Sequence, residues 1–280
     1  VIFAGLPEIF ESEGYDRTSM KLPKCQDRLI EEVLKVQPNV VVVLHNGSPV
    51  ELPWADRVSA ILEMYLGGQG VGEACDQLLF GEANPSGRLA ETFPYRLEDN
   101  PSYLHFPGNG KRVLYGEDIF IGYRYYDTKK VPVRYAFGHG LSYTEFAYGD
   151  LTLLSAQMTD EDILTVSLKV KNTGQTEGKE VVQLYVADLC GTPERPVKEL
   201  KGFAKVHLLP GEEKTVSMEI SARDLSYYEE RLGDWYAPSG TYRILIGHAS
   251  DDIRLHADIV FETKKKLPLR VDFTTTFGEL

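Results

Sequence analysis

The hydrophobic pattern changes its period about halfway along the chain, and this change limits the possible folds more than any other feature. In the first half, short apolar runs at 1–4, 40–44 and 60–65 alternate with segments whose apolar residues recur at helical spacing. Alternating strands and helices are typical of parallel βαβ units. From Leu151 onward apolar and polar residues alternate, as in the run 164–170. Since a period of two residues indicates half-buried strands, the sequence predicts an α/β domain followed by an all-β domain.

The first domain is expected to contain two longer helices and, around 54–58, a short helix or loop. Apolar residues recur at helical spacing over 23–36, Pro23 suits a first helical turn, and Pro38 ends the helix. A second helix is expected around 71–79. Three parallel strands form a small sheet, and a parallel sheet needs cover on both faces. We therefore expect a truncated parallel α/β sandwich, with further strands before Val1 in the parent protein.

The chain divides into three predicted segments. Residues 1–146 hold the truncated α/β domain and a connecting segment that is rich in Gly, Pro and Tyr and packed by its aromatic residues. Residues 147–263 hold alternating runs separated by turns such as Pro238-Ser239-Gly240, which is the pattern of an antiparallel β-sandwich. Residues 264–280 form a tail that opens with a basic run. A length of 280 residues suffices for about two domains.

Composition narrows the range of partners. A formal net charge of -12 and a pI near 5.0 argue against nucleic acid and anionic membrane surfaces, which attract clustered Lys and Arg. A neutral partner such as a sugar fits better. The longest apolar run, 40–44, is far shorter than the ~18 residues of a membrane-spanning helix. The three cysteines Cys25, Cys75 and Cys190 imply no disulfide framework, which favours the cytoplasm.

A cluster of acidic residues follows the first predicted strand. Glu11, Glu13 and Asp16 lie in one loop, and in open α/β sheets ligands gather outside the carboxyl ends of the strands. Closely spaced carboxylates raise one another's proton affinity, and a carboxylic acid that stays protonated near neutral pH can donate a proton to a departing oxygen. The alternative interpretation is a solvated acidic loop, because most charge clusters are solvated.

A series of short segments indicates a known family. The segment Glu13-Gly14-Tyr15-Asp16-Arg17 resembles the acid/base loop of glycoside hydrolase family 3, in which the Glu before Gly is the proton donor. Further matches to this family follow in order at 46–50, 67–69, 79–81, 84–89, 92–94, 122–126 and 137–143. Segments 182–186, 200–203 and 238–242 resemble the fibronectin type III-like domain that ends many of these enzymes.

The resemblance implies both a fold and an activity. Residues 1–146 would be the C-terminal portion of an α/β sandwich domain, and residues 147–263 a fibronectin type III-like domain. The chain would belong to a retaining, β-glucosidase-like glycosidase that hydrolyses terminal β-linked sugars of oligosaccharides or glycosides. By this resemblance Glu13 is the general acid/base and Tyr15 lies beside the aglycone, while Glu11 remains a rival proton donor.

The second catalytic carboxylate is expected outside this chain. In the family it is an Asp nucleophile in a (β/α)8 barrel that usually precedes this region. Retaining hydrolysis needs two carboxyl groups about 5–5.5 Å apart. The barrel is therefore an expected partner, and we expect the 280-residue chain alone to be inactive. Neither a cofactor nor a metal is expected.

Other candidate residues have simpler interpretations. His45 and His139 lack a paired nucleophile or metal-ligand spacing, so packing or turn roles are favoured. Trp54 and Trp235 could stack on sugars, but large aromatic residues more often pack in cores or interfaces. The glycines at 67–70 lack the Lys-Ser/Thr of a phosphate-binding loop and indicate a tight strand-to-helix turn. A non-catalytic carbohydrate-binding or interaction module remains the alternative function.

Overall fold

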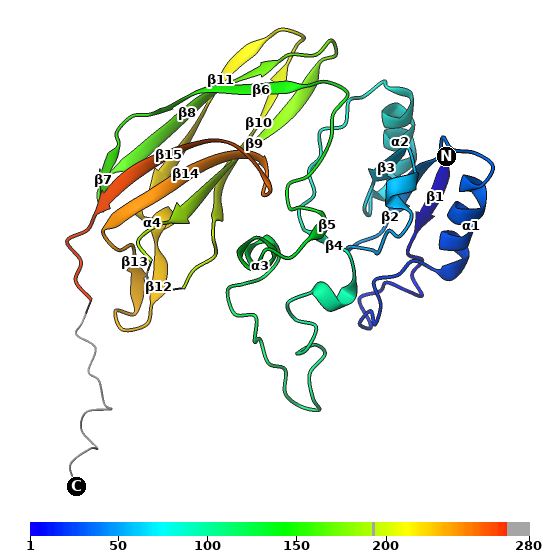
Figure 1. The fold of residues 1–280 in the computed structure, drawn as a ribbon, viewed down its shortest axis with the longest axis horizontal. Coiled ribbons are helices and arrows are strands. Elements are labelled where there is room, and N and C mark those ends of the chain that lie inside the picture. The colour runs from blue at the N-terminus through cyan, green and yellow to red at the C-terminus, as the bar shows by residue number, and fades with distance from the viewer. Residues whose placement is uncertain (192–193, 268–280) are drawn as a thin grey trace.

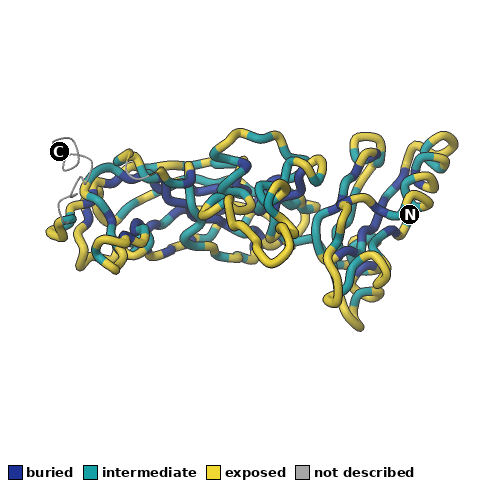
Figure 2. The backbone as a smooth tube through the Cα atoms, turned by 90° about the horizontal axis from the view of Figure 1, so that it is seen from below, coloured by how far each residue is buried: buried dark blue, intermediate teal, exposed yellow. Residues whose placement is uncertain are grey.

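The molecule has an α/β part at one end and a β-sandwich at the other (Figure 1). The computed structural model describes residues 1–191 and 194–267, so residues 268–280 of the predicted tail lie outside the described residues. Buried residues concentrate inside each part (Figure 2). The predicted fold class, an α/β unit followed by a β-sandwich, is confirmed. Within the described ranges no helix is both long and apolar enough to cross a membrane.

A parallel sheet of three strands, in the order β1-β2-β3, forms the centre of the α/β part. Its elements are β1 (Ile2–Gly5), α1 (Lys24–Leu34), β2 (Val41–His45), β3 (Ala60–Glu63) and α2 (Val71–Phe80). The middle strand β2 has three consecutive buried residues, Val42, Val43 and Leu44, so both of its faces are covered. This burial explains why β2 is a continuous apolar run. The predicted type and order of these elements are confirmed.

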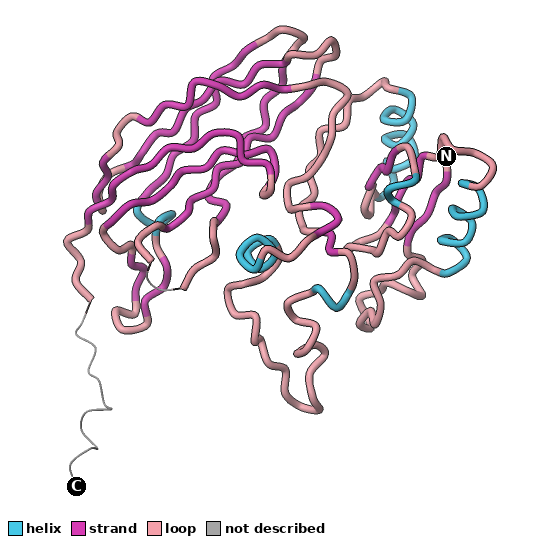
Figure 3. The backbone as a smooth tube through the Cα atoms, in the orientation of Figure 1, coloured by secondary structure: helices cyan, strands magenta, loops and turns pink. Residues whose placement is uncertain are grey.

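Short elements and loops connect the α/β part to the sandwich (Figure 3). They are β4 (Phe93–Pro94), η3 (Leu97–Asp99), α3 (Tyr123–Lys129) and β5 (Val133–Tyr135), in addition to η1 (Ala55–Arg57) and η2 (Gly68–Gly70) inside the α/β part. Tyr123 stacks on Phe137, with ring centroids 4.8 Å apart, and meets Tyr185 of the sandwich edge-on. Tyr103 and Tyr115, in contrast, are 43% and 79% exposed. The expected aromatic packing therefore holds for Phe93, Tyr123 and Phe137, but not for Tyr103 and Tyr115.

The sandwich contains a five-stranded sheet, β10-β9-β14-β15-β7, and a three-stranded sheet, β11-β8-β6. Its elements are β6 (Phe146–Leu153), β7 (Gln157–Thr159), β8 (Ile163–Asn172), β9 (Gly178–Asp188), β10 (Glu199–Leu208), β11 (Glu213–Ser221), α4 (Ala222–Leu225), β12 (Tyr227–Glu229), β13 (Asp234–Tyr236), β14 (Gly240–Ala249) and β15 (Asp252–Glu262). Paired strands run antiparallel, except that β7 runs parallel to β15. Leu164, Val166, Leu168 and Val170 of β8 all point into one core, as period two predicts.

A fully buried carboxylate ties the connecting segment to the sandwich. Glu180 of β9 accepts hydrogen bonds from Arg88 Nη2 at 3.0 Å, Tyr148 OH at 2.9 Å and His248 Nδ1 at 2.7 Å. The other ring nitrogen of His248 lies 2.8 Å from the carbonyl oxygen of Gly140. Burial by itself raises the pKa of Glu180, but His248 and Arg88 together hold this pKa below its ordinary value. The carboxylate is thus kept ionised inside the protein by Arg88 of the connecting segment and by Tyr148 and His248 of the sandwich. We call this meeting point of the two parts the joint.

A second cluster at this joint is centred on an amide. Asn84 Nδ2 donates to the carbonyl oxygen of Glu177 at 2.8 Å, while its Oδ1 accepts from Ser142 Oγ at 2.9 Å and from Tyr143 N at 2.8 Å. Both clusters therefore contain residues of the segments 84–89 and 137–143, which are among those that resemble glycoside hydrolase family 3. Their physical role is to hold the α/β part and the sandwich in one orientation.

We predict that Glu180→Ala lowers the free energy of unfolding by about 3–5 kcal/mol, because it leaves the guanidinium of Arg88 buried without its counter-charge. Urea unfolding of the purified chain measures this loss. Asp258→Ala serves as the control, since it removes an ion pair with Arg243 whose side chains are 44% and 39% exposed, and it should cost less than about 1 kcal/mol. Equal losses in the two variants would contradict the role given to Glu180.

Candidate active site

The acidic loop lies at the carboxyl edge of the parallel sheet. The loop follows β1, the segment 46–49 follows β2, and Glu63 is the last residue of β3. Side chains from all three strand ends meet at this edge, as expected for an open α/β sheet. The structure thus brings Glu11 of the loop close to Gly47 and Ser48 after β2.

Glu11 is held by the protein itself. Its carboxylate accepts hydrogen bonds from the backbone N–H of Gly47 at 2.7 Å and from Ser48 Oγ at 2.9 Å. Arg17 Nη1 lies 3.5 Å from the same carboxylate. A β-carbon at position 47 would come within 3.1 Å of Glu11 Oε1, so glycine suits this close approach. With its oxygens committed in this way, Glu11 fixes the loop to the end of β2.

Glu13 is the opposite case. It is exposed, and no hydrogen bond or ion pair to it occurs among residues 1–191 and 194–267. It lies in a tight turn that is closed by an antiparallel bridge between Ser12 and Tyr15. Tyr15 is 48% exposed, and its hydroxyl donates to the carbonyl oxygen of Glu8. The same turn therefore presents a free carboxylate and a half-exposed aromatic ring.

Arg17 braces the other end of the loop. Its guanidinium donates to Ser48 Oγ and, at 3.4 Å, to the carbonyl oxygen of Pro49. Burial lowers the pKa of Arg17, while the nearby carboxylates of Glu11 and Glu91 act in the opposite direction. Glu11 and Arg17 thus attach the loop at two points on either side of Glu13.

Two further carboxylates, Glu63 and Glu91, lie beside the loop, and the sequence analysis does not predict either as a site residue. Glu63 accepts hydrogen bonds from Tyr65 N at 2.9 Å and from Asn46 Nδ2 at 3.3 Å. Burial, together with the negative charges of Glu91 and Glu11, raises the pKa of Glu63 to about 7. Burial also raises the pKa of Glu91. The position of Glu63 near the end of a predicted parallel strand is the sequence feature that could have indicated it.

The remaining sequence candidates have packing roles. His45 stacks on Phe3, and His139 stacks on Tyr135. Burial lowers the pKa of His139. Trp54 is fully buried and donates through Nε1 to Asp27 at 2.9 Å, while the ring of Trp235 is covered by the guanidinium of Arg223 at 3.1 Å. The glycine segment forms η2 directly before α2, as the turn interpretation predicts.

We predict that Glu11→Ala speeds hydrogen exchange at the amide of Gly47, because this amide loses its carboxylate acceptor. Glu13→Ala is the matched control and should leave that exchange rate unchanged, since the Gly47 amide donates to Glu11 and not to Glu13. Exchange measured residue by residue by NMR on the two variants checks this. Protection of Gly47 that survives in Glu11→Ala would mean that Glu11 does not anchor the loop.

We predict that Glu63→Gln changes how stability depends on pH. The pKa of Glu63 rises from 4.5 to about 7 on folding, so between these values the folded chain binds a proton that the unfolded chain has released. Stability of the unmodified chain should therefore fall as pH rises through this window. Relative to it, the Glu63→Gln variant should gain about 1–3 kcal/mol in free energy of unfolding from about pH 5 to about pH 8. Parallel pH curves in urea unfolding would contradict the shift.

Comparison with solved structures places this fold among β-glucosidases. The β-glucosidase of Bifidobacterium adolescentis superposes with a TM-score of 0.91 at 41% identity, over 95% of this chain and 40% of that one. The β-glucosidase of Kluyveromyces marxianus in complex with glucose gives a TM-score of 0.88 at 43% identity, over 93% of this chain and 31% of that one.

Sequence comparison gives the same relatives. Thermostable β-glucosidase B of Acetivibrio thermocellus is 54% identical over 270 residues, which are 96% of this chain and 36% of that protein. The chain therefore spans about a third of the length of the relatives that it matches. The model of the glycosyl hydrolase family 3 C-terminal domain matches residues 1–143, and that of the fibronectin type III-like domain matches residues 180–250. Since the first of these models covers more than half of the 280 residues, the chain belongs to glycosyl hydrolase family 3.

Proposed function

We propose that this chain is the part of a retaining β-glucosidase that supplies the general acid/base, and that Glu13 is this residue. The observation that carries the proposal is the contrast between two neighbouring carboxylates. Glu11 is bonded to Gly47 and Ser48, whereas Glu13 is exposed and uncommitted. A general acid must be free to reach the oxygen that it protonates, so Glu13 suits this role and Glu11 does not.

The geometry supports different roles for the residues of the loop. Glu13 donates a proton to the leaving glycosidic oxygen and, as a carboxylate, later takes a proton from the attacking water. Tyr15, half exposed two residues further on, lines the aglycone side. Glu11 and Arg17 hold the loop in place. Fixed placement matters because misplacing a catalytic group by about 1 Å can cost roughly 100-fold in rate.

The second carboxylate is proposed to come from a (β/α)8 barrel outside this chain. The share of their length at which the relatives match, 30% to 36%, leaves room for such a domain. One carboxylate cannot act both as nucleophile and as acid, so the isolated chain should not hydrolyse glycosides. The names of the relatives favour an enzyme over a non-catalytic carbohydrate-binding module. The three free cysteines support a reducing compartment such as the cytoplasm.

We predict that, in the full-length protein, Glu13→Ala slows cleavage of cellobiose far more than formation of the glycosyl-enzyme from a dinitrophenyl β-glucoside. A dinitrophenolate leaves without protonation, so only the poor leaving group needs the acid. Typical general-acid contributions are about 100- to 10,000-fold. Rates of both substrates with the unmodified and substituted proteins give the ratio.

Azide supplies the second half of this test. It attacks without a general base, so it should restore turnover of the dinitrophenyl glucoside by Glu13→Ala and yield a β-glucosyl azide. Glu11→Ala keeps the Glu13 carboxylate and only loosens the loop that carries it, so its leaving-group effect should be smaller than that of Glu13→Ala, and azide should not rescue it. Rescue of Glu11→Ala together with an unresponsive Glu13→Ala would transfer the acid/base role to Glu11.

A further inference from the structure

A pocket of about 440 Å³ lies between the acidic loop and the connecting segment. Its walls come from the loop, the segment after β2, β4, the segment after η3 and the start of α3. The lining residues that matter here are Arg17, Ser48, Glu91, Thr92, Glu117 and Tyr126. The volume falls in the range of roughly 300–1,000 Å³ that small-molecule sites occupy. Glu13 and Tyr15 are not among its lining residues.

Two polar oxygens in the wall of this pocket have no partner. Thr92 is only 6% exposed, and its Oγ1 makes no hydrogen bond within the part of the chain that the structure describes. The same holds for the buried Oε2 of Glu117. A buried polar group without a partner costs about 1–3 kcal/mol, so such groups are rare without a bound molecule to satisfy them.

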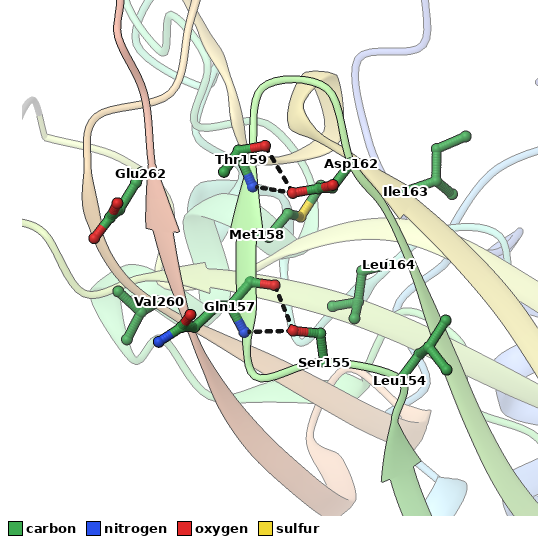
Figure 4. A pocket seen from close by; sticks show the side chains of 10 residues that line it. All are labelled: Leu154, Ser155, Gln157, Met158, Thr159, Asp162, Ile163, Leu164, Val260 and Glu262. Atoms are coloured by element: carbon green, nitrogen blue, oxygen red, sulfur yellow. Dashed lines mark hydrogen bonds between the residues drawn. The ribbon is translucent and has the colours of Figure 1, made fainter.

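A second pocket, in the sandwich, shows the contrast (Figure 4). It measures about 400 Å³ and lies beside β7 and β15. Several of its polar groups bond to one another: Thr159 Oγ1 donates to Asp162 at 2.7 Å, and Gln157 N donates to Ser155 Oγ at 3.0 Å. Among the described residues, none of the buried side-chain atoms that lack a hydrogen-bond partner belongs to this pocket.

The wall of the first pocket defines the chemistry of its occupant. The carboxylates of Glu91 and Glu117 accept hydrogen bonds, and the hydroxyl of Thr92 can donate or accept one. Ile121 and Tyr126 provide apolar surface beside them. Hydroxyl groups on a ring that also carries C–H faces satisfy both kinds of wall. Arg17 also lines the pocket, but one guanidinium beside two carboxylates leaves the wall with a net negative charge, which disfavours an anionic ligand.

We propose that this pocket binds a neutral monosaccharide through Thr92 and Glu117. The site goes beyond the acid/base function, because Glu13 takes no part in it. Two residues that line the pocket also hold the acidic loop in place. Arg17 and Ser48 line the pocket, and both contact the carboxylate of Glu11. A sugar bound here contacts the side chains that fix the loop two residues before Glu13.

The test is a titration of the 280-residue chain with D-glucose, followed by NMR chemical shifts. We expect saturable binding, with the dissociation constant raised about tenfold by Thr92→Val, which removes a hydroxyl, and by Glu117→Gln, which replaces an acceptor oxygen with an amide donor. Thr159→Val makes the same substitution in the sandwich pocket and should leave the dissociation constant unchanged. Glu13→Gln should also leave it unchanged, which separates this site from the proposed catalytic one.

Three outcomes would overturn the proposal. They are the absence of a saturable response to glucose, an unchanged dissociation constant in both pocket variants, and saturation of the same resonances by calcium chloride but not by glucose. The last result would make the pocket a cation site. Circular dichroism of each variant confirms folding, and Glu117→Gln, at a partly exposed position, decides the matter if Thr92→Val fails to fold.

Discussion

The buried carboxylate of Glu180 is the interaction on which the arrangement of the whole molecule depends. A fully buried negative charge is stable only when cationic and hydrogen-bonding partners surround it. Those partners come from the connecting segment through Arg88 and from the sandwich through Tyr148 and His248. All three must meet at one point, so the connecting segment has a single placement against β9. The edge of the α/β sheet that carries the acidic loop is positioned through this joint.

At the candidate site, too, a carboxylate is fixed by hydrogen bonds from a distant segment of the chain. Glu11 is a carboxylate whose oxygens are satisfied by a backbone amide and a hydroxyl from a distant segment. These bonds fix the loop to the end of β2, and they are the reason why the proposed function gives the proton transfer to Glu13 instead. Glu13 is exposed and lies in a turn that Glu11 and Arg17 hold on both sides. In the proposed function, Glu11 keeps the loop in place and Glu13 transfers the proton.

Much of the fold could be predicted because its signals are local. The runs in β2 and β8 carry their periods in the sequence, and Pro23 marks the start of α1. The distinction between Glu11 and Glu13 could not be predicted from the residues alone. It depends on the amide of Gly47, 36 residues away from Glu11. The raised pKa of Glu63 likewise arises from burial and from Glu91 and Glu11, which are distant along the chain. Contacts between residues that are distant along the chain cannot be predicted from the periodicity of apolar residues.

A structure of the full-length protein with an uncleaved β-glucoside bound would test the central claim most directly. The decisive measurement is the distance from each loop carboxylate to the glycosidic oxygen. We predict that a Glu13 oxygen lies within about 2.6–3.2 Å of it, with Glu11 still bonded to Gly47 and Ser48. If the Glu11 carboxylate instead leaves Gly47 and contacts the glycosidic oxygen, the roles given to these two residues are wrong.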